Sequence, residues 1–165
     1  MTRREEFLGR FGTVFENRPD LAAAVWDRGP PDPARGLEEL HGAFVAVLRA
    51  LPPGALLAFL NGHPDLSARS ARPAGLTADS RREQGSAGLD GLGDAAGRRL
   101  QDMNRAYRER FGFPFIMAVK GKRPDEILAA LESRLHKSEA EERAEALRQV
   151  ERILLLRLKE RLGEA

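Results

Sequence analysis

The sequence predicts an all-α protein, a single compact multi-helix domain over residues 1–165, for three reasons. Apolar residues recur at helical spacing along most of the chain. Prolines and glycines stand where these periodic stretches begin and end. One segment alone looks strand-like, residues 113–121 (FPFIMAVKG), and no partner strand accompanies it. Because no repeat or long linker divides the chain, we expect one domain.

The first half of the chain contains four expected helices. Pro19 suits the first position of the second helix and Gly29 lies just past its end. The third is stopped by Pro52 and Pro53. The segment 30–36 (PPDPARG) reads as a loop. The expected helices cover residues 4–17, 19–28, 37–51 and 54–60.

The second half begins with an irregular stretch, residues 67–76, followed by a helix after Thr77, which is a good N-cap. The Gly-rich run 88–97 is expected to break or kink this helix. In the last helix, Ser138 and Glu141 form a capping box. The further expected helices cover residues 98–112, 124–136 and 138–162.

Composition excludes several classes of function. The chain has no cysteine, which rules out disulfides, thiolate catalysis and cysteine metal sites. His41, His63 and His136 lie far apart and lack metal-ligand spacing, so we expect no metal site. The 27 basic and 25 acidic residues are interspersed, which argues against nucleic-acid binding. The longest apolar runs are too short to cross a membrane.

The segment 61–66 (NGHPDL) places a histidine on a stiff joint. Gly62 can end the preceding helix, and Pro64 keeps His63 out of the helical region. A lone histidine is usually structural or merely exposed. A backbone stiffened by proline also suits a general acid or base, because it fixes the ring in advance.

The segment 76–90 (LTADSRREQGSAGLD) carries a polar stripe. In a helix that starts after Thr77, Ser80, Glu83 and Gln84 share one face. One interpretation is a Ser80–Glu83 capping box on a surface helix. The other is a polar lining for a small molecule rich in N–H and C=O groups.

Two more features concern ligand oxygens. The segment 107–121 packs three phenylalanines around Gly112 and Pro114, which indicates either a buried core crossing or backbone N–H groups offered to a ligand.

On the last helix, Arg157 follows Ile153 and Leu154 at helical spacing and therefore points with the apolar stripe. An inward guanidinium needs an anionic partner, either an internal carboxylate or a substrate.

Four motifs together resemble one family, the 2-oxo-4-hydroxy-4-carboxy-5-ureidoimidazoline (OHCU) decarboxylases. They occur in the family's order and span about the last two thirds of the chain. The stretches around GLGDAAG and ARSARPAG depart from it. The motifs are GHPDL (62–66), LTADSRREQGSAGLD (76–90), MNRAYRERFGFPFIMAVKG (103–121) and RILLLRL (152–158).

The resemblance implies a cofactor-free, all-α enzyme, usually a homodimer, that converts a small anionic ureidoimidazoline into (S)-allantoin during urate (purine) catabolism. It implies that His63 is the acid/base residue and that Arg157 binds substrate. It places these other substrate contacts: Pro64, Ser80, Glu83, Gln84 and backbone groups of Phe115, Ile116, Met117, Ala118 and Val119. Lacking a peroxisomal tripeptide, the chain resembles a cytoplasmic, bacterial version. The alternative is a non-catalytic helical small-molecule-binding or scaffold protein of the same fold.

Overall fold

The computed structural model describes residues 1–66 and 76–164, which form eight α-helices, two short 3-10 helices and no strand. The all-α prediction is therefore confirmed. Contacts divide the chain into two compact units, Met1–Gly62 with Glu151–Ala165, and His63–Val150. Each unit is described by itself below. That the chain forms one domain stays a prediction, and the boundary between the units falls directly before His63.

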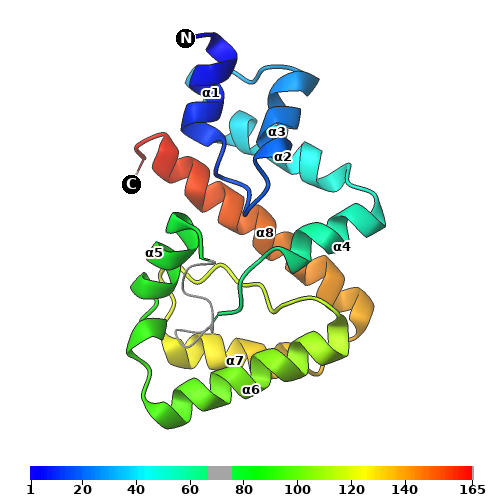
Figure 1. Ribbon diagram of the computed structural model, residues 1–165, viewed down its shortest axis with the longest axis vertical. Coiled ribbons are helices and arrows are strands. Elements are labelled where there is room, and N and C mark those ends of the chain that lie inside the picture. Colours follow the sequence, from blue (N-terminus) through cyan, green and yellow to red (C-terminus); the bar gives the residue numbers. More distant parts are fainter. Residues whose placement is uncertain (67–75, 165) are drawn as a thin grey trace. The chain divides into compact units, whose positions relative to one another are not determined.

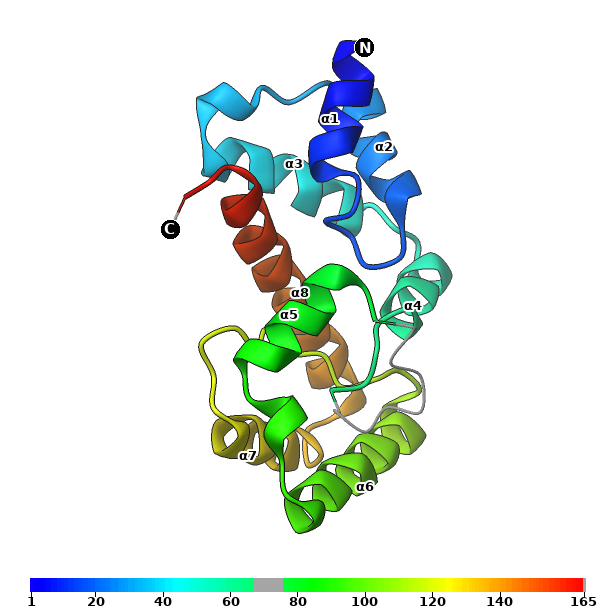
Figure 2. The ribbon, with the colours of Figure 1, turned by 60° about the vertical axis from the view of Figure 1, so that its left-hand side comes forward.

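The first unit contains the N-terminal helices and the end of the last helix. Both ribbon views show α1 and α2 side by side (Figures 1 and 2). A Thr2–Glu5 capping box starts α1, and Pro19 starts α2. The elements are α1 (Arg3–Phe11), α2 (Pro19–Arg28), η1 (Pro33–Arg35), α3 (Leu37–Arg49), α4 (Pro53–Asn61) and the last turns of α8 (Glu139–Arg161).

Two predictions for this unit need correction. The first helix ends at Phe11 rather than at residue 17. Val14 and Phe15 are buried in the turns that follow, so their apolar character continued the helical pattern without a helix. Asn17 then takes a left-handed backbone, with a φ of 54°. The predicted loop 30–36 also contains the 3-10 helix η1, whose first N–H groups are capped by Asp32.

The core of the first unit is aromatic. The ring centroids of Phe7 and Phe11 lie 5.1 Å apart, and the Phe15 ring stacks on Phe44 at 5.3 Å. Phe44 also lies 6.4 Å from Phe11, so one α3 side chain joins both groups. Such pairs add about 0.5–1.5 kcal/mol each to the stabilisation from burial alone.

The second unit contains the remaining helices. Helices α6 and α7 lie side by side in both ribbon views (Figures 1 and 2). Gly88 ends the turn after α5 with a left-handed backbone, and the break predicted at the Gly-rich run is confirmed. The stretch predicted to be irregular falls on residues 67–75, outside the described part. The elements are α5 (Ala78–Ser86), η3 (Leu89–Gly91), α6 (Asp94–Phe111), α7 (Pro124–Arg134) and the first turns of α8.

The strand-like segment is not a strand. Gly112 ends α6 with a φ of 78°, a conformation that favours glycine. Residues 114–119 then run without helix, turn or bend. Phe113 and Phe115 are buried against the Tyr107 ring, at centroid distances of 5.9 and 5.5 Å. The segment is thus the buried core crossing that the sequence suggested, held by side chains rather than by a sheet.

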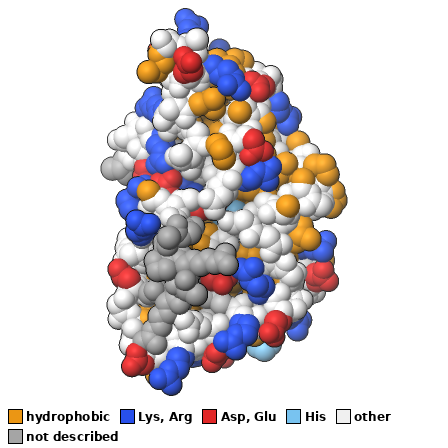
Figure 3. Space-filling model, viewed as in Figure 1, with side chains coloured by type: hydrophobic (Ala, Val, Ile, Leu, Met, Phe, Trp, Pro, Cys, Tyr) orange, Lys and Arg blue, Asp and Glu red, His pale blue; other side chains and the backbone are white. Residues whose placement is uncertain are grey.

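Two further observations concern the surface and hydropathy. Basic and acidic side chains are intermingled on the face drawn in Figure 3, as their interspersed order in the sequence suggests.

No single described helix is long and apolar enough to span a membrane. The pair α3 and α4, bent by 112°, meets that test by length and composition only.

Candidate active site

His63 follows directly on the end of α4. The helix ends at Asn61, and Gly62 caps it with a right-handed backbone, so the stop owes more to Pro64 than to glycine's conformational freedom. The side-chain amide of Asn17 donates a hydrogen bond to the Gly62 carbonyl at 3.2 Å. His63 is buried, with 8% of its surface exposed. The histidine is therefore buried, and the backbone is constrained on both sides of it, by the Asn17 hydrogen bond before it and by Pro64 after it.

The residues after His63 are tied to two helices of the second unit. The Gln84 amide on α5 donates to the Asp65 carbonyl at 3.3 Å. The Asn104 amide on α6 donates to the Leu66 carbonyl at 3.1 Å. Arg108 forms an ion pair with the Asp65 carboxylate at 2.9 Å, at the surface. These bonds direct the backbone that follows His63. Neither Asn104 nor Arg108 was singled out from the sequence.

The polar face of α5 points inward. Thr77 caps the helix as predicted, accepting a hydrogen bond from the Ser80 N–H at 3.2 Å. Ser80 and Gln84 are buried, and Glu83 is half-buried beside them. Because Ser80 lies inside the helix, it is not the N-cap that a Ser80–Glu83 capping box requires. The interpretation as an inward polar lining agrees with this burial.

Side chains of α7 and α8 hold the backbone of residues 115–119 at two positions. The Ile116 carbonyl accepts a hydrogen bond from Arg134 at 2.7 Å, and the Ala118 N–H donates to the Gln149 side chain at 2.9 Å. The N–H groups of Met117 and Val119, by contrast, bond to no residue in the described ranges.

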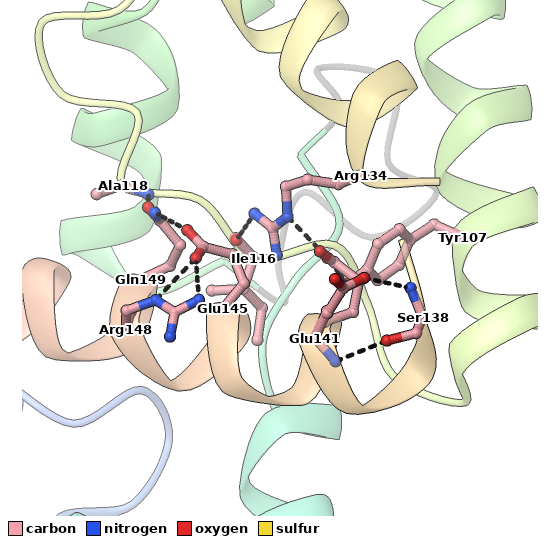
Figure 4. A network of polar contacts seen from close by, with 10 residues as sticks. Tyr107, Ile116, Ala118, Arg134, Ser138, Glu141, Glu145, Arg148 and Gln149 are labelled. Carbon is pink, nitrogen blue, oxygen red and sulfur yellow. Dashed lines mark hydrogen bonds and ion pairs between the residues drawn. The ribbon is translucent and has the colours of Figure 1, made fainter. Parts of the chain in front are cut away.

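A buried ionic cluster holds this segment, and Figure 4 shows it from close by. Arg134 on α7 pairs with Glu142 on α8, its Nε lying 2.7 Å from the carboxylate. The same carboxylate accepts the Tyr107 hydroxyl at 2.5 Å. The Arg134 guanidinium also lies over the Phe115 ring, 4.5 Å from its centroid. We call Tyr107, Arg134 and Glu142 the Arg134 triad.

The triad predicts an alkaline titration at one residue. Burial raises the pKa of Tyr107, and its hydrogen bond to Glu142 raises that pKa further. Because the folded state favours the neutral phenol, the resulting stability is present below the unfolded pKa of about 10 and is lost as the pH rises.

Tyr107 is the single tyrosine of the chain, so tyrosinate absorbance reports on it alone. We expect no tyrosinate signal from the native protein at about pH 10, where the denatured chain is half-titrated. Equal titration of the native and denatured chains would contradict the buried hydrogen bond.

Arg157 belongs to the first unit, whereas the other predicted site residues belong to the second. It is buried, as its place on the apolar stripe of α8 predicted, with 4% of its surface exposed. Its Nη1 forms an ion pair with Glu16 at 2.9 Å and donates to the Val14 carbonyl at 3.1 Å. An internal carboxylate is therefore one anionic partner of this guanidinium.

The structure thus links some of the predicted site residues directly, whereas others contact side chains of different helices. Gln84 joins the α5 face to the His63 segment. The segment 115–119 is bound instead by side chains of α7 and α8. Over residues 1–66 and 76–164, no group of three His, Cys, Asp or Glu side chains lies close enough to hold a metal ion.

Comparison with known proteins gives consistent matches. The family model of OHCU decarboxylase matches residues 1–159. The mouse 2-oxo-4-hydroxy-4-carboxy-5-ureidoimidazoline decarboxylase is 41% identical over 158 residues, which cover 96% of this chain and 87% of the mouse protein.

Two solved structures are similar. A crystal structure of (S)-allantoin synthase has a TM-score of 0.74 and 27% identity, covering 97% of this chain and 51% of that chain. A crystal structure of OHCU decarboxylase in the presence of (S)-allantoin has a TM-score of 0.72 and 21% identity, covering 94% of this chain and 99% of that chain. The second likeness supports the fold.

Proposed function

Because the chain belongs to the OHCU decarboxylase family, we propose that it decarboxylates OHCU to (S)-allantoin in urate degradation, without a cofactor. The observation that carries this proposal is the link between the inward polar face of α5 and the His63 segment, made by Gln84. It sets a buried imidazole and a buried polar lining in one compact unit.

His63 is the proposed acid/base group. It removes the proton of the substrate hydroxyl, the bond from the ring carbon to the carboxylate breaks, and CO2 leaves. The electron pair stays on the ring, where it is delocalised as an enolate-like anion. His63 then returns its proton to one face of the neighbouring ring carbon, which bears the ureido group, while the carbon that lost CO2 keeps its oxygen as a carbonyl; this protonation sets the (S) configuration. General acid–base catalysis of this kind typically contributes about 10²–10⁴-fold to the rate.

Polar groups around His63 are proposed to hold the substrate. The Gln84 Nε2 is engaged with Asp65, so its Oε1 is the atom we assign to substrate N–H groups. Glu83 accepts N–H groups of the ureido arm, and Ser80 and Pro64 complete the lining. A site that pairs buried polar groups in this way rejects analogues that lack the matching donors.

Backbone donors are proposed to stabilise the negative charge. Of the segment 115–119, Met117 and Val119 have N–H groups that bond to no residue in the described ranges, whereas Arg134 and Gln149 hold Ile116 and Ala118. Prearranged donors of this kind stabilise charge that develops during reaction, because they need no reorganisation. We therefore assign the anion-binding N–H groups to Met117 and Val119, while the remaining backbone groups of Phe115, Ile116 and Ala118 hold the segment in place.

Arg157 is proposed to bind substrate, a role that the family resemblance supplies. Arg157→Lys is expected to raise KM about tenfold, because a point ammonium does not replace a planar fork of donors. Steady-state kinetics with freshly prepared OHCU measure this effect. Arg143→Lys, on the same helix with 57% of its side chain exposed, is the control. Unchanged KM and kcat in Arg157→Lys would count against a direct role.

The function itself is tested by supplying freshly generated OHCU to the purified protein. We expect CO2 release well above the spontaneous rate, saturating with substrate. Binding of OHCU or allantoin without turnover would instead support the alternative of a non-catalytic binding protein of the same fold.

The assembly and location are also proposals. We expect a homodimer in the bacterial cytoplasm, in line with the family resemblance. Light scattering on the purified protein gives the mass directly, and the mass of one 18.2 kDa chain would contradict the dimer.

A further inference from the structure

We propose that the Arg134 triad positions the 115–119 backbone for catalysis, with Arg134 as its positioning residue; this inference rests on the proposed function. The triad touches neither His63 nor the α5 face through any bond described above. It contacts the 115–119 segment at two places: the Ile116 carbonyl, 2.7 Å from the Arg134 Nη1, and the Phe115 ring, which lies against Arg134 and Tyr107.

Arg134 holds the Ile116 carbonyl in a fixed geometry. Arg134 binds two groups with different nitrogens of one rigid plane, Glu142 through Nε and Ile116 through Nη1. The position of the carboxylate therefore fixes the direction from which the Ile116 carbonyl is held. Met117 follows that carbonyl through a planar peptide bond, so the Ile116 carbonyl and the Met117 N–H belong to one rigid unit. Turning one turns the other.

A second hydrogen bond holds the segment two residues further on, at Ala118. Gln149 accepts the Ala118 N–H, and its own amide donates to Glu145 at 2.8 Å, which fixes its orientation. Figure 4 shows Arg134 and Gln149 reaching the segment at Ile116 and Ala118. The Met117 N–H shares a peptide unit with the Ile116 carbonyl, and the Val119 N–H belongs to the peptide unit that follows the Ala118 N–H. Holding these two positions therefore constrains both N–H groups, which bond to no residue in the described ranges.

The Arg134 triad places charged groups in the core at a cost in desolvation. Glu142 is almost completely buried, Arg134 retains 8% exposure, and the Arg134 Nη2 is buried with no hydrogen-bond partner among residues 1–66 and 76–164. A buried ion pair is often matched or exceeded in stability by apolar residues of similar volume. Stability alone therefore does not explain why three polar groups occupy this core. A requirement to hold the Ile116 carbonyl at one angle does explain it.

The test separates stability from positioning. The triple variant Tyr107→Phe/Glu142→Leu/Arg134→Met replaces the triad by apolar residues and leaves no buried charge unpaired. We expect its Tm to stay near that of the wild type, and its kcat/KM to fall about tenfold to a hundredfold, since small misplacements in a site have effects of this size. Ile127→Val is the control, because it trims a fully buried α7 side chain and keeps the triad.

A second readout does not depend on turnover. We expect NMR order parameters of the Met117 and Val119 amides to fall in the triple variant and to stay unchanged in Ile127→Val. If the triple variant does not fold, Arg134→Lys replaces it. That variant keeps a positive charge beside Glu142 but loses the planar guanidinium that holds the Ile116 carbonyl. We therefore expect the same fall in kcat/KM and in the order parameters of the Met117 and Val119 amides.

The outcomes are distinguishable. Wild-type kcat/KM and wild-type order parameters in a folded triple variant would overturn the positioning role. A wild-type protein that does not turn over OHCU would instead refute the proposed function, and the amide readout would still judge whether the triad orders the segment.

Discussion

Replacing His63 with alanine is expected to lower kcat by about 10²–10⁴-fold, the usual contribution of a positioned acid/base group. The allantoin that still forms is expected to be racemic, because no group then delivers the proton to one face of the ring. The fold should survive, since Pro64 and the hydrogen bonds to Asp65 and Leu66 still direct the chain. Rate and optical rotation are measured together on freshly prepared OHCU.

His136→Ala is the matched control, because His136 is exposed in the same unit. We expect it to keep the wild-type rate and to yield (S)-allantoin. A His63→Ala protein that produced (S)-allantoin at the wild-type rate would refute the assignment of His63.

The second large effect is expected at Glu16, whose carboxylate lies 2.9 Å from Arg157. Glu16 is 1% exposed and Arg157 is 4% exposed. Glu16→Ala takes away the carboxylate that pairs with a buried guanidinium, and breaking a buried pair in this way typically costs about 3–5 kcal/mol. Denaturant unfolding followed by circular dichroism gives the free energy of unfolding.

A surface pair provides the comparison for this effect. Arg49 and Glu151 also lie 2.7 Å apart, but Arg49 is largely exposed. Arg49→Ala should therefore cost about 1 kcal/mol or less. Equal losses from Glu16→Ala and Arg49→Ala would show that burial does not amplify the Glu16–Arg157 pair.

Much of the fold was predictable because local chemistry marks the ends of helices. Pro19, Thr77 and the Ser138–Glu141 capping box start helices where expected. The first helix was overextended because buried turn residues after Phe11 mimic a helical stripe. The strand-like segment forms no sheet because its apolar residues are buried by neighbouring helices, and the sequence alone did not decide between this core crossing and a ligand-binding backbone.

Part of the site was predictable from helical faces. A helix start at Thr77 correctly placed Ser80, Glu83 and Gln84 on one face, but the sequence left open whether that face was exposed or inward, and the structure buries Ser80 and Gln84. The inward direction of Arg157 followed from the apolar stripe of α8. His63 was singled out by Pro64 alone, and its substrate role rests on the resemblance rather than on spacing.

The Arg134 triad was missed although a signal for it exists. Arg134 follows Ile127 and Leu131 at seven- and three-residue spacing, and all three are buried on α7. The same reasoning that identified Arg157 would have identified it. Glu142 is harder to find, because its place among the charged residues 139–143 is typical of an exposed helix start. Its pairing with Tyr107 joins residues 35 apart in sequence, which helical spacing does not reveal.

We expect this chain itself to control the decarboxylation of OHCU and the configuration of the product. Circular dichroism of the allantoin formed when freshly generated OHCU meets the wild-type protein tests both at once. The (S) enantiomer should form rapidly and in excess. Racemic allantoin appearing at the spontaneous rate would contradict this expectation.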